Sequence, residues 1–118
     1  MTYNRLDKLY LSFKGAEKSF PFDKTTAVYK VGNKMFALMS ERADVLQTNL
    51  KCDPIYSLEL RTLYSEIIPG YHMNKKHWNT LLLNAELDDE IVEELSEHSY
   101  ELVFKSLTKK LREEISRS

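Results

Sequence analysis

"TAVYKVGNKMFALM", residues 26–39, is the stretch of sequence that decides the fold. Two runs rich in β-branched, aromatic and other apolar residues flank Gly32-Asn33. A two-residue connection of this kind predicts a type I′ or II′ hairpin, because glycine tolerates a positive φ. We expect the pairs Val31–Lys34 and Tyr29–Phe36 on one face, and Lys30–Met35 and Val28–Ala37 on the other. Both faces are partly apolar, so both strands should lie inside an antiparallel sheet.

Further strands are expected on both sides of this hairpin. One precedes it at residues 18–20. Another covers "DVLQTNL", residues 44–50, where Leu46, Thr48 and Leu50 alternate with polar positions. After a break at "IIPGYHM", the run "HWNTLLLN", residues 77–84, returns to strand. The sequence therefore predicts an antiparallel sheet of about five to six strands.

Helices are expected near the N-terminus and in the middle of the chain. Leu6, Leu9, Tyr10 and Phe13 recur at spacings of three and four, which predicts a short amphipathic helix that stops near Gly15. A middle helix begins where Asp53 can cap and Pro54 takes the first helical position. We expect its apolar stripe to consist of Ile55, Leu58 and either Thr62 or Leu63.

The C-terminal third predicts a long amphipathic helical region, bent near Thr108. Its apolar positions are Leu87, Ile91, Leu95, Leu102, Leu107, Leu111 and Ile115. Its acidic start and basic end complement the helix dipole. Taken together, residues 1–118 predict a single two-layer α+β domain, with the helices mainly on one side of the sheet.

Length and composition limit the classes of protein. A chain of 118 residues is one domain that buries about two-thirds of its unfolded surface. The single cysteine, Cys52, forms no internal disulfide, and "MTYNRLDKLY" has no secretion-signal pattern, so we expect a reducing cytoplasm. Apolar runs such as "MFALM" are far shorter than the roughly 20 residues that span a bilayer, which excludes membrane insertion.

The charge is unevenly distributed along the chain. The net charge is −1, but residues 1–50 carry +3, residues 51–85 carry +1 and residues 86–118 carry −5. A nearly neutral domain argues against strong nucleic-acid binding, although a local positive surface can still attract an anion. The acidic start of the C-terminal helix accounts for much of this segregation.

Four motifs carry a resemblance to a known family. "LKCDP" (50–54), "LELRTLY" (58–64), "IIPGYHMNKKHWNT" (67–80) and "SYELV" (99–103) are similar in order and spacing to the MmcQ/YjbR family of small bacterial proteins, over most of the chain. The resemblance implies a compact α+β domain of the CyaY-like or secretion-chaperone-like kind. It also implies DNA binding through a "double wing" of two hairpins. One departure is Thr108, where the family often has proline.

Catalytic and metal chemistry are not expected. Cys52 lies between a strand and a helix, where a small thiol commonly packs in the core. His72 and His77 are five residues apart across a turn, His98 lies on the last helix, and none of them forms a cluster with zinc-type spacing. The acidic residues 86–101 suit a solvated helix start. We therefore predict no catalytic residue, no metal site and no cofactor.

A nucleic-acid contact is the functional hypothesis for "YHMNKKHW", residues 71–78. Lys75 and Lys76 can contact phosphates, while Trp78, His77 or Tyr71 offer stacking planes. The remaining candidates are amides beside this stretch, Asn74 and Asn79, and the tip of the first hairpin, Lys30, Asn33 and Lys34. Two turns with basic tips can straddle a duplex as wings. Equally, Tyr71 and Trp78 can be buried anchors, and Asn74 can bond its own backbone.

The alternative is a protein-interaction or chaperone-like module. One open face of the sheet, together with a C-terminal tail of Leu107, Leu111 and Ile115 extending beyond the core, can bury a partner peptide or a second copy of the chain. A contiguous positive surface joining Lys30, Lys34, Lys75 and Lys76 would favour nucleic acid. An exposed apolar groove would favour a protein partner.

Overall fold

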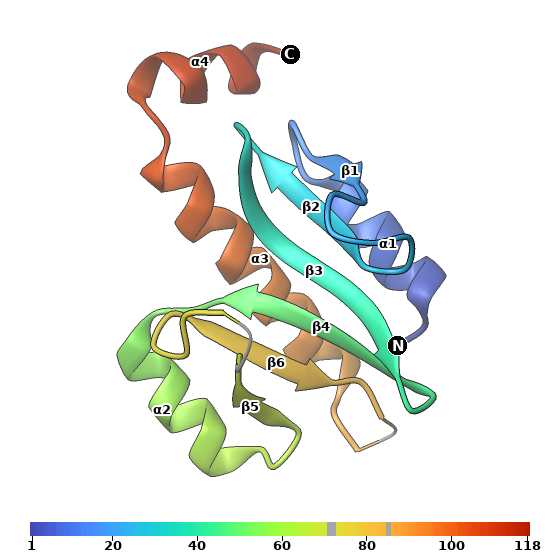
Figure 1. Cartoon of the computed structure of the whole chain (residues 1–118). Helices are drawn as coiled ribbons and strands as arrows, with labels where there is room; N and C mark the ends of the chain where they lie inside the picture. Colours follow the sequence, from blue (N-terminus) through green and yellow to red (C-terminus); the bar gives the residue numbers. More distant parts are fainter. Residues whose placement is uncertain (71–72, 85) are drawn as a thin grey trace.

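The Gly32-Asn33 hairpin lies inside one antiparallel sheet. The computed structural model describes residues 1–70, 73–84 and 86–118, and over these ranges the chain forms six strands and four helices (Figure 1). The strands are β1 Glu17–Ser19, β2 Ala27–Val31, β3 Lys34–Arg42, β4 Val45–Lys51, β5 Ile67–Pro69 and β6 Trp78–Leu82. Their order in the sheet is β1-β2-β3-β4-β6-β5, and each neighbouring pair is antiparallel. The α+β class is confirmed.

The turn of this hairpin is a type I′ turn, because φ is positive at both Gly32 (55°) and Asn33 (67°). The predicted pairs Val31–Lys34 and Lys30–Met35 are confirmed. The other two pairs were wrong, because the register shifts after Tyr29 and pairs Tyr29 with Ala37 and Val28 with Leu38. An extra residue in β3 is a β-bulge. It lets Phe36 and Ala37 both join the core and leaves Leu38 on the opposite face.

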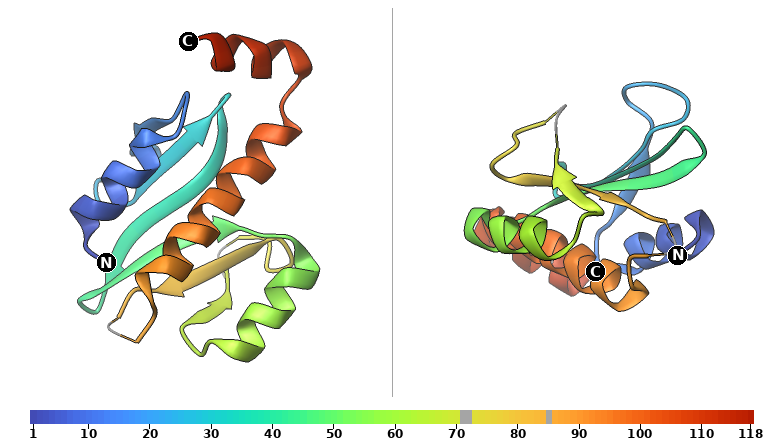
Figure 2. Two further views of the ribbon diagram at one scale, coloured as in Figure 1. Left: turned by 180° about the vertical axis from the view of Figure 1, so that it is seen from behind. Right: turned by 90° about the horizontal axis from the view of Figure 1, so that it is seen from below.

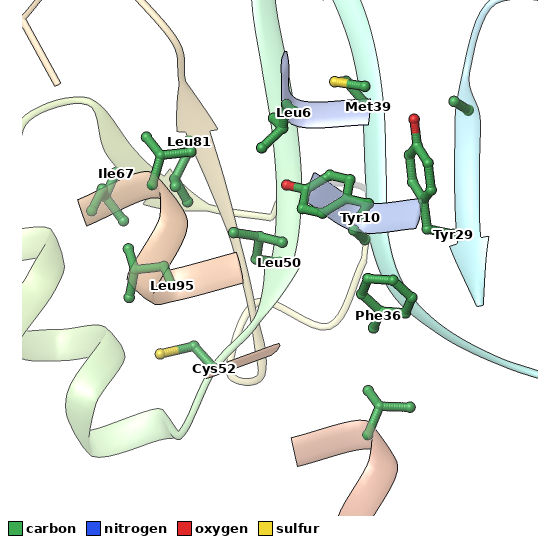
Figure 3. Packing of buried hydrophobic residues seen from close by; sticks show 14 of the residues in the cluster. Leu6, Tyr10, Tyr29, Phe36, Met39, Leu50, Cys52, Ile67, Leu81 and Leu95 are labelled. Carbon is green, nitrogen blue, oxygen red and sulfur yellow. The ribbon is translucent and has the colours of Figure 1, made fainter. Parts of the chain in front are cut away.

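The helices lie on one face of the sheet, as predicted, and the other face is open (Figure 2). They are α1 Tyr3–Ser12, α2 Pro54–Leu63, α3 Asp89–Ser106 and α4 Lys109–Arg117. The core fills the space between α1, α3 and the sheet, and Figure 3 shows Tyr10, Tyr29 and Phe36 at its centre. These three rings pack within 6.4 Å of one another, centroid to centroid.

The middle helix begins as predicted but buries a different face. Asp53 Oδ1 accepts hydrogen bonds from the backbone N–H of Ile55 and Tyr56, at 3.0 and 3.1 Å. Ser57 and Leu60 face the core. The predicted stripe was wrong: Ile55, Leu58 and Leu63 are 79, 66 and 67% exposed. The helix packs against the sheet through hydrogen bonds as well as apolar contacts, so hydrophobic periodicity pointed to the wrong side.

The C-terminal helical region breaks at Leu107 and Thr108, as predicted. Thr108 caps α4, since its Oγ1 accepts from the N–H of Leu111 at 3.2 Å. Leu107 is buried and, with Leu111, lies so close to Gly32 that a Cβ there would come within 3.0 Å of their side chains. Ile115 packs in the same way against Gly15. The expectation that this tail extends beyond the core was therefore wrong.

Candidate functional site: the groove on the open face of the sheet

The open face of the sheet is hollowed into a groove of about 770 Å³. Its floor crosses β3, β4 and β6. Apolar side chains, among them Leu38, Met35 and Trp78, make part of this floor, and Trp78 and Leu38 pack with Val28 into a small second cluster. Polar side chains make the rest: Ser40, Gln47, Asn49 and Thr80. The groove is therefore amphipathic and wide enough for a ligand.

Strand alternation explains which residues face the groove. Successive side chains of a strand point to opposite faces. Leu46, Thr48 and Leu50 are buried toward the helices, so Gln47 and Asn49 of the same strand face the groove. No hydrogen-bond partner for the Gln47 amide is found within residues 1–70, 73–84 and 86–118. Asn49 Nδ2 has only the sulfur of Met73, at 3.7 Å. These amides are available to a ligand.

One wall of the groove is the loop between β1 and β2, which rises above the open face in Figure 2. Asp23 organises this loop: its Oδ1 accepts from the N–H groups of Thr25 and Thr26 at 2.8 and 2.6 Å. These backbone hydrogen bonds lower the pKa of the Asp23 carboxyl below its usual value. Phe22 precedes it, lines the groove and is 64% exposed. The carboxylate is engaged by its own loop, whereas the aromatic ring is presented to solvent.

The opposite wall includes Met73 and Asn74, which begin the turn of residues 73–77. The carbonyl of Asn74 accepts from the N–H groups of His77 and Trp78 at 3.1 and 2.9 Å. Its side-chain Oδ1 accepts from the N–H of Lys76 at 3.0 Å. Asn74 thus bonds its own turn, which is the second of the two interpretations offered by the sequence. One lone pair of its side-chain oxygen is thus occupied, while the other lone pair and the amide nitrogen remain for a ligand.

Arg61 of α2 holds this turn in place. Its Nε donates to Asn79 Oδ1 at 2.7 Å, and its guanidinium also donates to the carbonyls of Lys75 and Trp78. Asn79 is buried, and its Nδ2 donates to Ser57 Oγ at 3.1 Å. The Asn79 side chain therefore forms hydrogen bonds with α2 and does not line the groove, although the sequence made it a candidate for ligand contact.

The other predicted contact residues are divided between two places. Lys75 and Lys76 are exposed in the 73–77 turn, and His77 is half-buried beside them. Trp78 is 9% exposed in the groove floor. Asn33 and Lys34 lie at the hairpin tip, away from the groove and beside the α3–α4 corner, where Lys34 Nζ is 3.5 Å from Ser106 Oγ. Tyr71 and His72 lie outside the described residues.

The two faces of the molecule differ in charge. Lys30 shares the open face with Val28, Lys51 shares it with Gln47 and Asn49, and Arg42 lines the groove. Carboxylates also share this face: Asp23 lines the groove, and Glu17 lies opposite Lys30. The acidic side chains of α3 lie on the far side of the sheet: Asp89, Glu90, Glu93, Glu94, Glu97 and Glu101. The helix layer also carries basic side chains, among them Arg5, which pairs with Asp89 and Glu93, and Lys109 and Lys110 of α4, so the charge segregation of the sequence separates the two faces only in part.

Most groove residues were not candidates at the level of sequence, among them Gln47, Phe22 and Arg42. The alternation of "DVLQTNL" carried the signal for Gln47, because it predicted Leu46 and Thr48 on one face and left Gln47 on the other. Phe22 and Arg42 carried no local signal. Phe22 sits in a loop and Arg42 at a strand end, and only the packing of the chain brings both to the groove.

Cys52 is 3% exposed and packs in the core (Figure 3). Burial raises the pKa of its thiol, which keeps it protonated. Within the described ranges, His, Cys, Asp and Glu form no group of three suited to a metal ion. No helix in the same ranges has the length and apolarity needed to cross a membrane.

A six-stranded antiparallel sheet, covered by helices on one face and hollowed on the other, defines a small single-domain α+β protein with an open sheet face. The sequence profile of the YjbR family matches residues 11–102. The chain belongs to this family, in agreement with the resemblance to MmcQ/YjbR proteins.

Relatives share both the sequence and the fold. The chain is 39% identical over 103 residues to the uncharacterized protein YbdF of Escherichia coli O157:H7, covering 87% of this chain and 84% of YbdF. It is 32% identical over 101 residues to YjbR of Escherichia coli K12, covering 86% of each. The crystal structure of Deinococcus radiodurans DR2400, a DUF419 domain, is 39% identical with a TM-score of 0.91, covering 98% of this chain and 88% of DR2400. A Pseudomonas syringae crystal structure is 28% identical with a TM-score of 0.75, covering 87% and 99%.

Proposed function

We propose that the protein is a non-catalytic DNA-binding protein that holds the nucleic acid across the open face of its sheet. The observation that carries this proposal is the combination of a groove with basic side chains around it and the acidic helix α3 on the far side. It accounts for a nearly neutral chain that still attracts an anion on one face, because the local potential governs association.

Basic residues from both predicted regions contribute to this surface, together with residues from the sheet. Arg42 lines the groove, Lys30 and Lys51 project from strands on the same face, and Lys75 and Lys76 are exposed in the turn that follows Asn74 of the wall. Lysine and arginine contacts to phosphates position a nucleic acid without reading its sequence. The tip residues Asn33 and Lys34 lie away from the groove, beside the α3–α4 corner, so the contiguous positive surface expected to include Lys34 is not formed and the proposal rests on the other basic residues of the open face. We therefore propose that one groove with basic residues around it holds the DNA, in place of the two wings expected from the sequence. The proposal requires no cofactor and suits a cytoplasmic protein.

Titration of the intrinsic fluorescence of Trp78 tests this function, because the only tryptophan of the chain lies in the groove floor. We expect short DNA to change its emission at low salt. Log affinity should fall with log salt concentration, with a slope of about −0.7 to −0.9 for each phosphate neutralised. Four or five contacts predict a slope of roughly −3 to −4.

A matched pair of variants separates a specific surface from general charge loss. K75A/K76A removes two positive charges from the turn beside the groove, and K109A/K110A removes two from α4. We expect the first to weaken binding by at least tenfold and to flatten the salt slope by about 2, and the second to change neither much. Equal effects of the two variants, or no binding at low salt, would refute DNA binding by this face. Urea melts of both variants check that the fold is intact.

A second candidate is the protein-interaction module, which the exposed side chains of α2 favour. Ile55, Leu58 and Leu63 present apolar surface to solvent on one helix, as contact surfaces for protein partners do. If this helix self-associates, the sedimentation mass will rise with concentration and Leu58→Ser will abolish the rise. A sedimentation mass that stays at the monomer value at all concentrations would exclude self-association, and so would exclude a second copy of the chain as the partner.

A further inference from the structure

We infer that the groove takes unpaired nucleobases, so that the ligand is single-stranded DNA and not a duplex. This inference rests on the proposed function and specifies the ligand of that same site. It is carried by the chemistry of the groove floor together with the exposed ring of Phe22 on its wall.

The floor is suited to bases and not to a phosphate backbone. A duplex presents its phosphates outward and keeps its bases stacked and paired, so an apolar floor has little to contact. Leu38, Met35 and Trp78 form such a floor here. Unstacked bases, in contrast, bring apolar faces that pack on aromatic and other apolar side chains. The basic residues around the groove then hold the backbone that connects those bases.

Phe22 supplies the stacking plane. Its ring is 64% exposed, although a large apolar side chain in a short loop can usually turn toward the core. The hydrogen bonds of Asp23 to Thr25 and Thr26 fix the loop and keep Phe22 on the groove wall. A base lying against this ring is covered on one face by Phe22 and directed toward the floor.

Two amides in the floor can contact base edges. Gln47 and Asn49 project from the same strand into the groove, two residues apart. Each carries both a donor and an acceptor, which matches the mixed edges of unpaired bases. A duplex hides the pairing edges, so this contact is open only to single strands.

The size of the groove and the position of the hairpin tip agree with this ligand. A volume of about 770 Å³ falls in the range of pockets for small organic molecules, of the order of 300–1,000 Å³, and so suits one or two bases. The Gly32-Asn33 tip is covered on one side by Leu107 and Leu111. It is therefore not available from that side as a second wing around a duplex.

The test compares a single strand of about twelve nucleotides with a hairpin duplex of similar length, both titrated against Trp78 fluorescence at low salt. Phe22→Ala removes the proposed stacking ring. Phe20→Ala is the matched control, because Phe20 is also exposed, at 46%, in the same loop but does not line the groove. Neither side chain is buried, and Phe20 makes only an exposed contact with Lys18 Nζ, 5.6 Å from its ring, so both variants should remain folded, which urea melts check.

We expect the single strand to bind more tightly than the duplex. Phe22→Ala should weaken single-strand binding by roughly 5- to 150-fold, the range found for loss of one base-stacking contact, and leave duplex binding unchanged. Phe20→Ala should stay within about twofold of the wild type. Tighter binding of the duplex, or equal effects of the two variants, overturns the inference while DNA binding stands. Absence of binding to both ligands overturns the proposed function itself.

Discussion

Asp7 connects three elements through one carboxylate. Its Oδ1 accepts from Tyr29 Oη at 2.6 Å and lies 2.8 Å from Lys18 Nζ, so that α1 is joined to both β2 and β1. Burial acts to raise the pKa of Asp7, but the hydrogen bonds from Lys18 and Tyr29 and the charge of Lys18 outweigh it and lower the pKa below the usual value. The ionised form is therefore the one that stabilises the fold.

Asp7→Asn should lower the free energy of unfolding by about 1–2 kcal/mol at pH 7, because a charge-assisted contact is lost. A lowered folded-state pKa contributes stability above the unfolded-state value, near 3.9, and this contribution is lost as the pH falls through the folded-state value. The difference between variant and wild type should thus shrink as the pH falls below the unfolded-state value and through the lowered folded-state value. Urea melts between pH 2 and 7 measure it. Asp44→Asn, at an exposed turn position, is the control, and a constant difference at all pH values would contradict this account.

At the scale of elements, α2 acts as a support for the groove wall. Sequence periodicity assigned its apolar residues to the core, but Arg61, Ser57 and Leu60 face the sheet instead. Three oxygen atoms of Asn79, Lys75 and Trp78 accept from one guanidinium, which ties the helix to the 73–77 turn. The position of the wall therefore depends on a polar contact that hydrophobic patterning does not detect.

Arg61→Lys should loosen this wall although it keeps the charge. A lysine cannot reproduce the planar, multiple donors of the guanidinium, and half-buried acceptors are left without partners, at a cost of about 1–3 kcal/mol. We expect lower stability, a shift of Trp78 emission toward that of exposed tryptophan, and weaker DNA binding. Glu59→Ala, on the exposed face of α2, should change none of these. Wild-type emission and stability in Arg61→Lys would exclude the supporting role.

The α3–α4 junction explains how threonine can stand at the position where the family resemblance implies proline. Thr108 has φ −61°, the value that proline requires, and the preceding Leu107 is extended at ψ 159°, as a residue before proline must be.

Thr108→Ala should lower the free energy of unfolding by about 1 kcal/mol, because the cap to Leu111 is lost. Thr108→Pro should be nearly neutral, since a stiffer unfolded chain offsets the lost cap. A loss of more than about 3 kcal/mol in Thr108→Pro, measured in urea, would show that this junction does not accept proline.

At the scale of the whole molecule, a ligand that binds the open face should raise the stability of the folded state. A ligand that binds only the folded state at about a hundred times its Kd adds about 2.7 kcal/mol to the free energy of unfolding. For a domain of this size, this predicts a rise in Tm of about 10 °C with single-stranded DNA at low salt.

The rise in Tm should shrink as salt increases, because counterion release drives the binding. Differential scanning fluorimetry of the wild type and K75A/K76A measures it, and the variant should show the smaller rise. A rise that persists undiminished at about 1 M salt would contradict an electrostatic contact with phosphates.

Local patterns predicted most of the fold because each is a short-range property. Gly32-Asn33 fixed the hairpin turn, Asp53 and Pro54 fixed the start of α2, and Thr108 marked the junction of α3 and α4. The strand register was wrong beyond Lys30, because a bulge depends on which side chains the core accepts and not on the turn. Of the predicted contact residues, Asn74 and Trp78 line the groove and Lys75 and Lys76 lie in the turn beside it, whereas Asn79 and the hairpin tip serve internal contacts.

The sequence by itself determined the α+β class, the central hairpin, the helix boundaries and the family, because turn chemistry, caps and periodicity act over a few residues. Only the tertiary structure decided which face of the sheet stays open and which residues line it. Phe22, Arg42 and Gln47 are up to 25 positions apart in the chain and meet only when loop and strands assemble. Likewise, only the fold places the acidic α3 on the face of the sheet opposite the groove, because a pattern of charges along the chain does not specify the face on which a helix packs.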